Sequence, residues 1–382
     1  MLRVLHIISD TNIGGAGRHL LTFLEHYDRA KLAVYVLCPP ASLLLEQCAA
    51  LGVKTYTSSY LAGDRSFGGR GLSGLIREVG AIARNCRIDI VHTHASFSGR
   101  MAAKAAGVPR IVYTKHRMDW ETSRGWFKKR VVAFLNRLTS HKVIAVSLAV
   151  KEDLLLNGVP EERIALIYNS VDIKKLRGQA GPEKLKFIPG VGDSRVVGMV
   201  ARLEPEKGHR YFLEAARAVL AKLENVYFIV VGTGSLLNSL KETAKILGIG
   251  ERVLFTGYQD DIARFIAAMD VMVVPSLTEA FGISMIEGMC LGKPCVASAV
   301  GGLVEIAGQD GRAAFLVPPG DGEAIAEKVI FLLENPDLAA AMGLRAAEEV
   351  EKRFSAEKMA DEITSLYYEM ITGNKLQYSI RE

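Results

Sequence analysis

Two glutamates eight residues apart, Glu279 and Glu287, stand in the segment Ser276–Leu291, SLTEAFGISMIEGMCL. An apolar run typical of a buried strand precedes this segment, and an apolar run typical of a helix follows Gly282. We therefore predict that Glu279 lies on a short loop and Glu287 on the helix after it. The backbone N–H groups of Ala280–Ile283 would point out of the helix start, where the helix dipole favours a phosphate.

Such a site offers amides to an anion and two carboxylates to hydroxyl groups, and a sugar nucleotide presents both kinds of group. The alternative is that Glu279 is a first-turn acid that stabilises the helix dipole and Glu287 a solvated helix residue. The spacing of the two glutamates does not separate these interpretations.

Two cations follow the first predicted strand of the second half, in the sequence ARLEPEKG. Arg202 can grip a phosphate with two parallel hydrogen bonds, and Lys207 adds a point charge. Together they could neutralise a diphosphate leaving group. The chain has no D-x-D motif and no compact His/Asp/Glu motif of metal-ligand type, so we expect these cations to act without a metal. The alternative is two surface cations that flank a turn.

Glycines follow two of the predicted strands. Gly14 and Gly15 stand after the first strand, where backbone amides could approach a phosphate or a sugar closely. A second glycine-rich turn is Gly232–Ser235. A dinucleotide fingerprint needs a third glycine, and Leu20 and Leu237 occupy that place in the two turns. An NAD enzyme is therefore disfavoured, and tight turns are the alternative interpretation.

Three histidines and an asparagine lie at predicted strand ends or domain ends. His92 and His94 share one strand face, but no third metal ligand is evident, so we interpret them as polar residues at a strand end. His116 follows the next strand and could bond a sugar or move a proton, although such a residue can also be structural. Asn169 closes the first domain and could contact the sugar donor; the alternative is an ordinary turn.

Strand-like and helix-like apolar patterns alternate along the chain in two series. The predicted strands are Val4–Ser9, Ala33–Cys38, Ile90–His94, Ile111–Tyr113, Lys142–Val146, Val196–Ala201, Val226–Val231, Val253–Thr256, Val271–Val274, Cys295–Ala297 and Ala314–Val317. The predicted helices are Arg18–His26, Gly74–Asn85, His209–Leu223, Leu236–Leu247, Ile262–Met269, Ile283–Leu291 and Glu323–Glu334. This alternation predicts an α/β class with two Rossmann-like parallel-sheet domains that face a cleft.

The first domain is predicted over residues 1–172 and the second over residues 195–354. Lysines, glycines and prolines interrupt the apolar pattern between them, so residues 173–194 are predicted as a linker. In residues 355–382, Ser355 can cap a helix whose apolar stripe includes Ile363 and Tyr367. We expect this helix to cross back to the first domain.

The composition is that of an ordinary globular protein, and 382 residues suit two domains. The five cysteines form no CxxC motif and are expected to be reduced core residues of a cytosolic protein. No apolar run approaches the ~20 residues that span a bilayer, and the N-terminus does not have the pattern of a signal peptide. We expect a cytoplasmic protein that does not act on nucleic acid.

The net charge of +5 is unevenly distributed. Residues 1–170 hold 23 Lys and Arg against 13 Asp and Glu, so this part carries +10 and the remainder −5. The segment Arg124–Leu138 reads as a basic amphipathic helix, which suits an anionic membrane surface. A helix packed on its own sheet with a charged outer face is the alternative. Peripheral membrane association is therefore a hypothesis.

Taken together, these motifs resemble family 4 of the retaining GT-B glycosyltransferases, also called glycosyl transferases group 1. The resemblance runs nearly end to end and is carried by Gly14-Gly15, YTKH at 113–116, YNSVD at 168–172, ARLEPEKG at 201–208, VGTGS at 231–235, PSLTEAFGISMIEGMCLGKP at 275–294 and LVPPGD at 316–321. It implies a GT-B fold, an acceptor site in the first domain and a nucleotide-sugar site in the second. Gly17 departs from the family, in which many members have Glu.

The resemblance also implies roles for single residues. Arg202 and Lys207 would hold the donor diphosphate, and Glu287 the nucleotide ribose. Glu279 and the amides of Phe281, Gly282 and Ile283 would contact the transferred sugar and phosphate. Gly14 and Gly15 would approach the donor phosphate and the acceptor, and His116 would lie at the reacting centre.

We therefore expect a retaining glycosyltransferase, of the hexosyltransferase type, that moves a sugar from a nucleoside-diphosphate donor such as a UDP-sugar to a hydroxyl acceptor. The acceptor would be a glycan, a glycolipid or another molecule of the cell envelope, and no cofactor or essential metal is expected. One alternative is a nucleotide-sugar epimerase of the same fold, which would convert the donor without an acceptor. Another is a non-catalytic partner subunit that binds sugar nucleotides.

Overall fold

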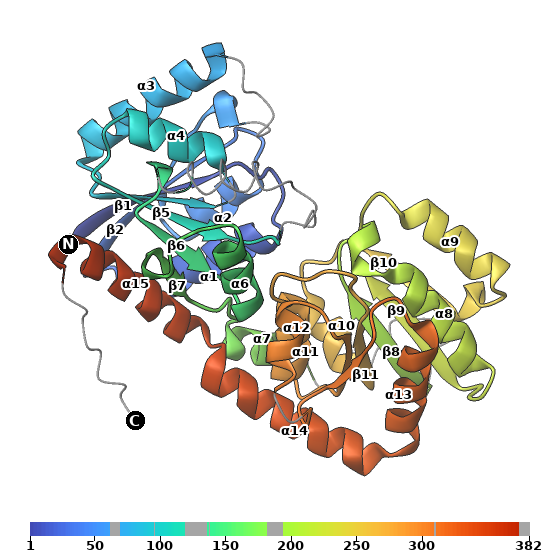
Figure 1. Ribbon diagram of the computed structural model, residues 1–382. Helices are drawn as coiled ribbons and strands as arrows, with labels where there is room; N and C mark the ends of the chain where they lie inside the picture. The colour runs from blue at the N-terminus through green and yellow to red at the C-terminus, as the bar shows by residue number, and fades with distance from the viewer. Residues whose placement is uncertain are drawn as a thin grey trace. The chain divides into compact units, whose positions relative to one another are not determined.

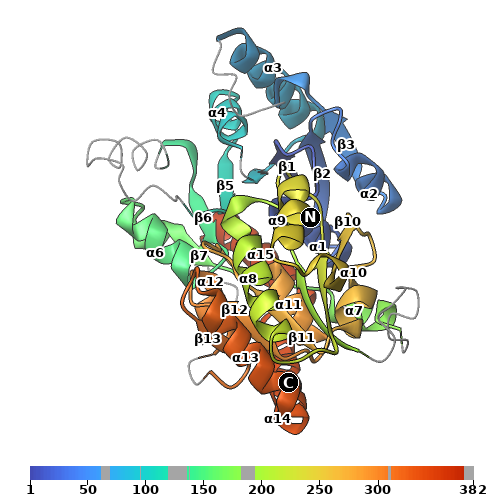
Figure 2. The same ribbon diagram turned by 90° about the vertical axis from the view of Figure 1, so that its right-hand side faces the viewer.

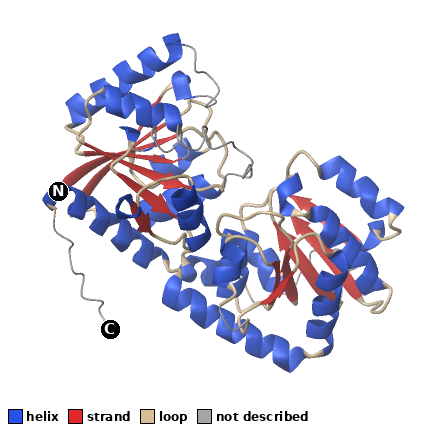
Figure 3. Cartoon of the chain, in the orientation of Figure 1, coloured by secondary structure: helices blue, strands red, loops and turns tan. Residues whose placement is uncertain are grey.

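The computed structural model describes residues 1–61, 69–94, 96–118, 136, 138–181, 194–308 and 311–373. The chain divides into two compact units. Unit 1 comprises residues 1–170 together with residues 356–382, and unit 2 comprises residues 171–355. Each unit contains a sheet between layers of helices, as Figures 1 and 3 show.

The sheet of unit 1 is parallel throughout. Its strands are β1 (Leu2–Ile8), β2 (Leu32–Cys38), β3 (Lys54–Thr57), β4 (Ile90–His94), β5 (Arg110–Lys115), β6 (Lys142–Ala145) and β7 (Ile164–Leu166). They lie in the order β3-β2-β1-β4-β5-β6-β7. The strand order reverses between β1 and β4, and the loops at such a switch point are the usual place for a ligand.

Helices cover both faces of this sheet. They are α1 (Gly15–His26), α2 (Leu44–Ala50), α3 (Gly69–Cys86), α4 (Phe97–Ala105), α6 (Leu148–Leu156) and α15 (Ala356–Thr372), with short 3-10 helices at Ser59–Leu61 and Glu161–Arg163. Because side chains alternate along β1, Val4 and Ile8 pack with α1, α2 and α15, whereas Leu5 and Ile7 pack with α3 and α4.

The last helix, α15, is part of unit 1 although unit 2 precedes it in the chain. Its apolar stripe, which includes Ile363 and Tyr367, is buried against the same core as Phe23 of α1. Two polar contacts tie it to residues at the starts of β5 and β2. The Arg110 guanidinium donates to the Met370 carbonyl at 2.9 Å, and Tyr368 donates to the Lys31 carbonyl at 3.2 Å. The C-terminal helix therefore completes the core of the first unit.

The sheet of unit 2 is also parallel. Its strands are β8 (Arg195–Val200), β9 (Val226–Val231), β10 (Val253–Gly257), β11 (Val271–Val274), β12 (Cys295–Ser298) and β13 (Phe315–Val317), in the order β10-β9-β8-β11-β12-β13. Here the order reverses between β8 and β11, so the loops that follow these two strands lie at the switch point.

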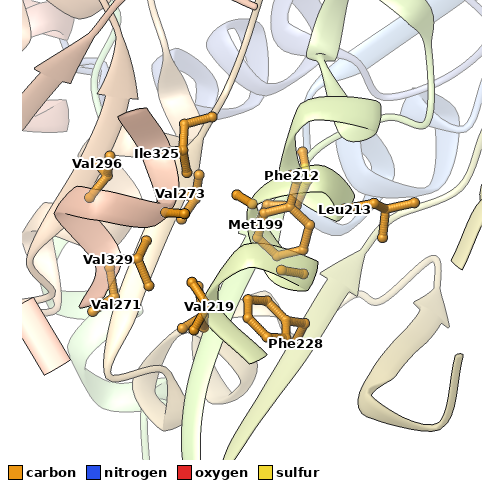
Figure 4. Close-up of a cluster of buried hydrophobic side chains, with 14 of the residues drawn as sticks. Met199, Phe212, Leu213, Val219, Phe228, Val271, Val273, Val296, Ile325 and Val329 are labelled. Atoms are coloured by element: carbon orange, nitrogen blue, oxygen red, sulfur yellow. The ribbon is translucent and has the colours of Figure 1, made fainter. Parts of the chain in front are cut away.

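The helices of unit 2 are α7 (Ile173–Gln179), α8 (His209–Leu220), α9 (Leu237–Ile246), α10 (Ile262–Ala268), α11 (Ile283–Cys290), α12 (Gly302–Ile306), α13 (Gly322–Glu334) and α14 (Pro336–Arg353), with 3-10 helices at Pro205–Lys207 and Gly250–Arg252. Figures 2 and 4 show α8 and α13 over one face of the sheet. Phe212 and Val329 of these helices pack there on Phe228 and Val271 of the strands. This core holds β8 and β11 in place beneath their loops.

The predicted α/β class with two parallel sheets is confirmed. Two short strands, β3 and β7, and the helices α2, α4, α6, α7, α12 and α14 were not predicted. The segment predicted as a linker begins with α7, because Asp172 caps that helix by accepting a hydrogen bond from the Lys175 amide at 2.8 Å. Most of the predicted basic helix Arg124–Leu138 lies outside the described residues. No helix in the described part of the chain is both long and apolar enough to cross a membrane.

Candidate active site

The loops after β8 and β11 are held together backbone to backbone. The Leu277 amide donates to the Glu206 carbonyl at 2.8 Å. Gly208 has φ +71°, and a Cβ at this position would lie 1.9 Å from the Pro275 carbonyl oxygen. Only glycine allows both this backbone conformation and this close approach. The contact sets the position of the neighbouring residue, Lys207.

Lys207 and Glu279 form an ion pair between these two loops, with 2.6 Å between Nζ and Oε2. The Ser276 hydroxyl donates to the same carboxylate oxygen at 3.3 Å. The two charged side chains are 19% and 14% exposed, so bulk water screens the pair less than it screens a surface pair. The structure thus brings together two residues that the sequence separates by 72 positions.

Arg202 lies in the same loop but is held differently. Its guanidinium lies 3.2 Å from Glu206, and its side chain is 58% exposed. An exposed pair of this kind contributes little to stability, so the guanidinium can turn toward another anion at small cost. The two predicted cations therefore differ: Lys207 is fixed by its neighbours and Arg202 is available at the surface.

The second glycine-rich turn, after β9, packs on this loop. Gly232 has φ +139°, and a Cβ there would lie 2.0 Å from the Ala201 carbonyl. Glu204 accepts hydrogen bonds from the Ser235 amide and hydroxyl, and these bonds lower the pKa of the carboxyl. The turn is required for close packing, which agrees with the tight-turn interpretation.

Helix α11 begins next to Glu279. Gly282 is its N-cap, with φ +120°, and Ile283 is its first residue. The Phe281 side chain is buried, with its ring edge-to-face on Phe354 at 5.4 Å between centroids. Phe281 can therefore meet a ligand through its backbone only. The first amides of a helix lack the carbonyl partner that amides of the helix interior have, so a helix start such as that of α11 can bind an anion.

Glu287 lies in the middle of α11 and is only 5% exposed. The alternative interpretation of a solvated helix residue is therefore wrong. Burying a carboxylate is costly unless polar groups surround it. This buried glutamate is therefore a candidate for binding hydroxyl groups.

In unit 1, α1 begins directly after the loop that follows β1. Gly14 is the N-cap and Gly15 the first helical residue. Gly14 has φ −88°, which any residue adopts, and an added Cβ would meet nothing within 4 Å. The fold does not itself require glycine at position 14. The open space beside it is consistent with a ligand that approaches the backbone there.

Five histidines from four elements gather in the core of unit 1, which the sequence did not reveal. His6 lies on β1, His92 and His94 on β4, His19 on α1 and His116 just after β5. His94 Nε2 lies 2.9 Å from His6 Nδ1, and His94 Nδ1 lies 3.2 Å from His116 Nε2. His92 and His94 lie at the end of β4, as predicted, and both side chains are buried.

Burial keeps these imidazoles neutral at pH 7. Desolvation lowers the pKa of His6 to about 3 and that of His19 to about 4. The pKa values of His92, His94 and His116 are also well below the ordinary value, mainly because of burial. An additional positive charge in this cluster would repel the others and lose its hydration.

Neutral imidazoles are also metal ligands. Ligand atoms of His6, His92 and His94 lie within 4.8 Å of one another, as do those of His19, His94 and His116. The sequence suggested no third ligand for the pair on β4, and the structure supplies candidates. However, His6 and His94 already share a hydrogen bond, and His92 is bonded to Tyr367 and Thr114. We therefore describe the cluster as a hydrogen-bond network.

Asn169 is buried beside this cluster. Its Oδ1 lies 2.8 Å from His19 Nδ1, so the amide orients the imidazole and leaves His19 Nε2 without a protein partner among the described residues. The structure thus links Asn169 to His19, a residue that the sequence analysis did not select.

Comparison with known proteins identifies the family of this chain. The model described as "Glycosyl transferases group 1" matches residues 182–349, and the model described as "Glycosyltransferase Family 4" matches residues 13–175. An Escherichia coli protein named UDP-Gal:alpha-D-GlcNAc-diphosphoundecaprenol alpha-1,3-galactosyltransferase is 29% identical over 299 residues, 75% of this chain and 77% of the relative. The N-acetyl-alpha-D-glucosaminyl L-malate synthase of Bacillus anthracis is 26% identical over 79% of this chain and 80% of the relative.

Solved structures agree with the fold. Anabaena Alr3699/HepE in complex with UDP and glucose superposes with a TM-score of 0.80 at 23% identity, over 96% of this chain and 100% of that chain. Sucrose-phosphate synthase from Thermosynechococcus elongatus superposes with a TM-score of 0.78 at 21% identity, over 98% and 100%. Both family models, the named relatives and the two parallel sheets lead to one conclusion. The chain belongs to family 4 of the GT-B glycosyltransferases, enzymes that transfer a sugar from a nucleotide sugar.

Proposed function

We propose that this enzyme transfers a sugar from a nucleoside-diphosphate sugar to a hydroxyl acceptor with retention of the anomeric configuration and without an essential metal. The observation that carries the proposal is the Lys207–Glu279 ion pair at the switch point of unit 2, beside the start of α11. It places a fixed cation, a carboxylate and a helix start within one small set of loops.

The donor diphosphate would bind to Lys207 and Arg202, together with the backbone amides of Phe281, Gly282 and Ile283. Cations and oriented amides stabilise the negative charge that develops on the leaving diphosphate, which is the role that a divalent metal has in other enzymes. The half-buried position of Lys207 strengthens its interaction with a phosphate.

The two glutamates would bind hydroxyl groups of the donor. Lys207 and Ser276 contact Oε2 of Glu279, so Oε1 can accept a hydrogen bond from the transferred sugar. Glu287, buried on α11, would accept hydrogen bonds from the ribose.

An ion-paired carboxylate is a weakened nucleophile, which favours a mechanism in which Glu279 forms no covalent intermediate with the sugar. The acceptor hydroxyl would attack from the face that the diphosphate leaves, and the leaving phosphate would help to remove its proton.

The acceptor would bind to unit 1. Gly14 has open space beside it at the start of α1, where the acceptor and the donor phosphate would approach Gly14 and Gly15. His116 would lie at the reacting centre. Asn169 would contact the sugar donor and also orient His19. UDP-Gal in the name of the Escherichia coli relative and the UDP in the Anabaena complex favour a UDP-sugar donor.

Two observations support a proposal for the acceptor class. The Escherichia coli relative is named for an acceptor on diphosphoundecaprenol, a lipid carrier. Residues 1–170 of this chain carry a net charge of +10, which suits an anionic surface. We infer that the enzyme takes part in polysaccharide or glycolipid synthesis, in the cytoplasm and at the inner face of a membrane.

A donor screen followed by turnover tests the proposal. Thermal shift with UDP-, GDP- and ADP-sugars identifies the donor, because a ligand at a hundred times its Kd adds about 2.7 kcal/mol to stability. We expect turnover to be unchanged by EDTA, and NMR of the product to show the anomeric configuration of the donor. Loss of turnover in EDTA that manganese restores would overturn the metal-free mechanism. Conversion of the donor without an acceptor would indicate an epimerase.

A further inference from the structure

A continuous series of buried hydrogen bonds joins the C-terminal helix to His116. Tyr367 of α15 lies 2.6 Å from His92 Nδ1 and 3.4 Å from His6 Nε2. His6 Nδ1 lies 2.9 Å from His94 Nε2, and His94 Nδ1 lies 3.2 Å from His116 Nε2. Every member belongs to unit 1.

A second arm of the series ends at a threonine. His92 Nε2 lies 2.6 Å from the Thr114 hydroxyl, which is buried on β5. At the opposite end, His116 Nδ1 is buried and makes no hydrogen bond with a described residue. The series therefore has a hydroxyl at one end and a ring nitrogen without a partner at the other.

The tautomers along this series depend on one another. A neutral imidazole carries one N–H and one bare nitrogen, so a histidine that accepts a hydrogen bond on one side must donate on the other. Tyr367 has one proton, which it gives either to His6 or to His92. If it donates to His6, then His6 donates to His94, His94 donates to His116 Nε2, and the proton of His116 lies on Nδ1. If it donates to His92, every one of these bonds is reversed.

Thr114 decides between the two arrangements. When Tyr367 donates to His6, His92 donates to Tyr367 and its bare Nε2 accepts the hydrogen of the Thr114 hydroxyl. In the reversed arrangement that hydroxyl would accept from His92, and its own hydrogen would have no acceptor among the described residues. His116 Nδ1 has no partner among the described residues in either arrangement. The second arrangement adds the Thr114 hydroxyl as a further buried donor without an acceptor, which costs about 1–3 kcal/mol, so the first arrangement is favoured.

We propose that Tyr367, His6 and His94 are positioning residues that fix the proton of His116 on Nδ1. His116 then offers an N–H donor, and the neighbouring His19 offers a bare Nε2, because its Nδ1 faces the Asn169 carbonyl oxygen. The two rings lie edge-to-face with 5.0 Å between centroids. A donor beside an acceptor matches a hydroxyl group, which both accepts and donates.

This inference rests on the proposed function in one respect, that the hydroxyl belongs to a bound sugar. The pair binds the hydroxyl by hydrogen bonds and takes part in no bond making. The low pKa values of the histidines support the neutral state on which the tautomer argument depends. Burial also raises the pKa of Tyr367 well above its ordinary value, so the phenol keeps its proton.

Nitrogen-15 NMR of the histidine rings in the full chain at pH 7.5, without any ligand, tests the proposal. Protonated and bare ring nitrogens give separate signals, and the variant His116→Gln assigns those of His116. We expect the wild-type His116 to be protonated on Nδ1. Replacing Tyr367 by Phe removes the only hydrogen-bond donor that the described residues offer to His6 Nε2, so we expect His116 to lose its single tautomer. Thr114→Val should have the same effect, and Thr114→Ser should retain the wild-type spectrum.

Tyr368→Phe is the matched control, because Tyr368 lies on the same helix but donates to the Lys31 carbonyl outside the cluster. His116 protonated on Nε2 in the wild type, or unchanged signals in Tyr367→Phe and Thr114→Val, would overturn the proposal. If Tyr367→Phe does not fold, the two Thr114 variants decide. Binding of UDP, measured by calorimetry in parallel, should be equal in the wild type and in the variants of Tyr367, Thr114 and Tyr368. A wild-type chain that does not bind UDP would contradict the proposed function while the tautomer result stands.

Discussion

The ammonium group of Lys207 lies 2.6 Å from the Glu279 carboxylate, and each residue comes from a loop that flanks the switch point of the second sheet. Neither side chain is fully exposed, so the pair organises the site before a donor arrives. A diphosphate that enters would meet a cation whose position is already set. The cost of ordering that side chain is then small, which favours binding.

Replacing Lys207 by Ala should weaken binding of UDP by at least about tenfold, because a charge-assisted hydrogen bond to phosphate is lost and Glu279 remains as an unpaired negative charge. Isothermal titration calorimetry measures this. Lys245→Ala is the control, since it removes the same charge from an exposed position on α9. Equal affinity in both variants would remove Lys207 from the phosphate site.

Replacing Glu287 by Gln should lower affinity for UDP by about tenfold and leave the helix in place, because the amide keeps the shape of the carboxylate but binds the ribose hydroxyls more weakly. The exposed Glu334, changed to Gln, controls for the loss of one charge. Calorimetry with UDP and with pyrophosphate, which has no ribose, separates the contribution of the ribose to the affinity from that of the phosphates. A Glu287→Gln chain that loses affinity for pyrophosphate and UDP alike would contradict the ribose assignment.

Two glycine substitutions should differ in their effect on stability. Gly208→Ala should lower the free energy of unfolding by more than about 1 kcal/mol, because the new Cβ meets the Pro275 carbonyl and φ is positive. Gly14→Val should cost less stability than Gly208→Ala, since φ is −88° and its Cβ meets nothing within 4 Å. We expect Gly14→Val to lower turnover by filling the space beside the start of α1. Full turnover in that variant would argue against a ligand there.

The histidine cluster should make unit 1 less stable as the pH falls. The folded-state pKa values of His6 and His19 are about 3 and about 4, below the unfolded value of 6.5, so the unfolded chain binds more protons in this window. The stability is complete above pH 6.5 and is lost as the pH falls toward 4, by about 1.4 kcal/mol per pH unit for each such histidine.

Hydrogen exchange of the β1 and β4 amides between pH 7 and pH 5, corrected for the intrinsic exchange rate, measures this loss. His19→Asn should reduce the slope, because one buried group no longer titrates. A free energy of opening that does not change over this range would show that these histidines are not held neutral by burial.

Much of unit 2 could be predicted from local patterns. The apolar run Val271–Val274 is the strand β11 that was predicted, and the predicted helix Ile283–Leu291 differs from α11 by one residue. Helix α14 was missed because its alanine-rich sequence has a weak apolar stripe, although it packs on α11. The short edge strands β3 (KTYT) and β7 (IAL) were missed because a half-buried run of three or four residues is too short to show a strand pattern.

The sequence by itself determined the α/β class, the alternation that produces two parallel sheets, and the family, because apolar periodicity and motif spacing are local properties of the chain. Only the tertiary structure decided that Lys207 meets Glu279, that Glu287 is buried, and that Tyr367 meets His6 and His92. Tyr367 and His6 are separated by 361 positions. No local pattern encodes such a contact, because it exists only once a sheet has brought β1 and β4 side by side and α15 has packed on them.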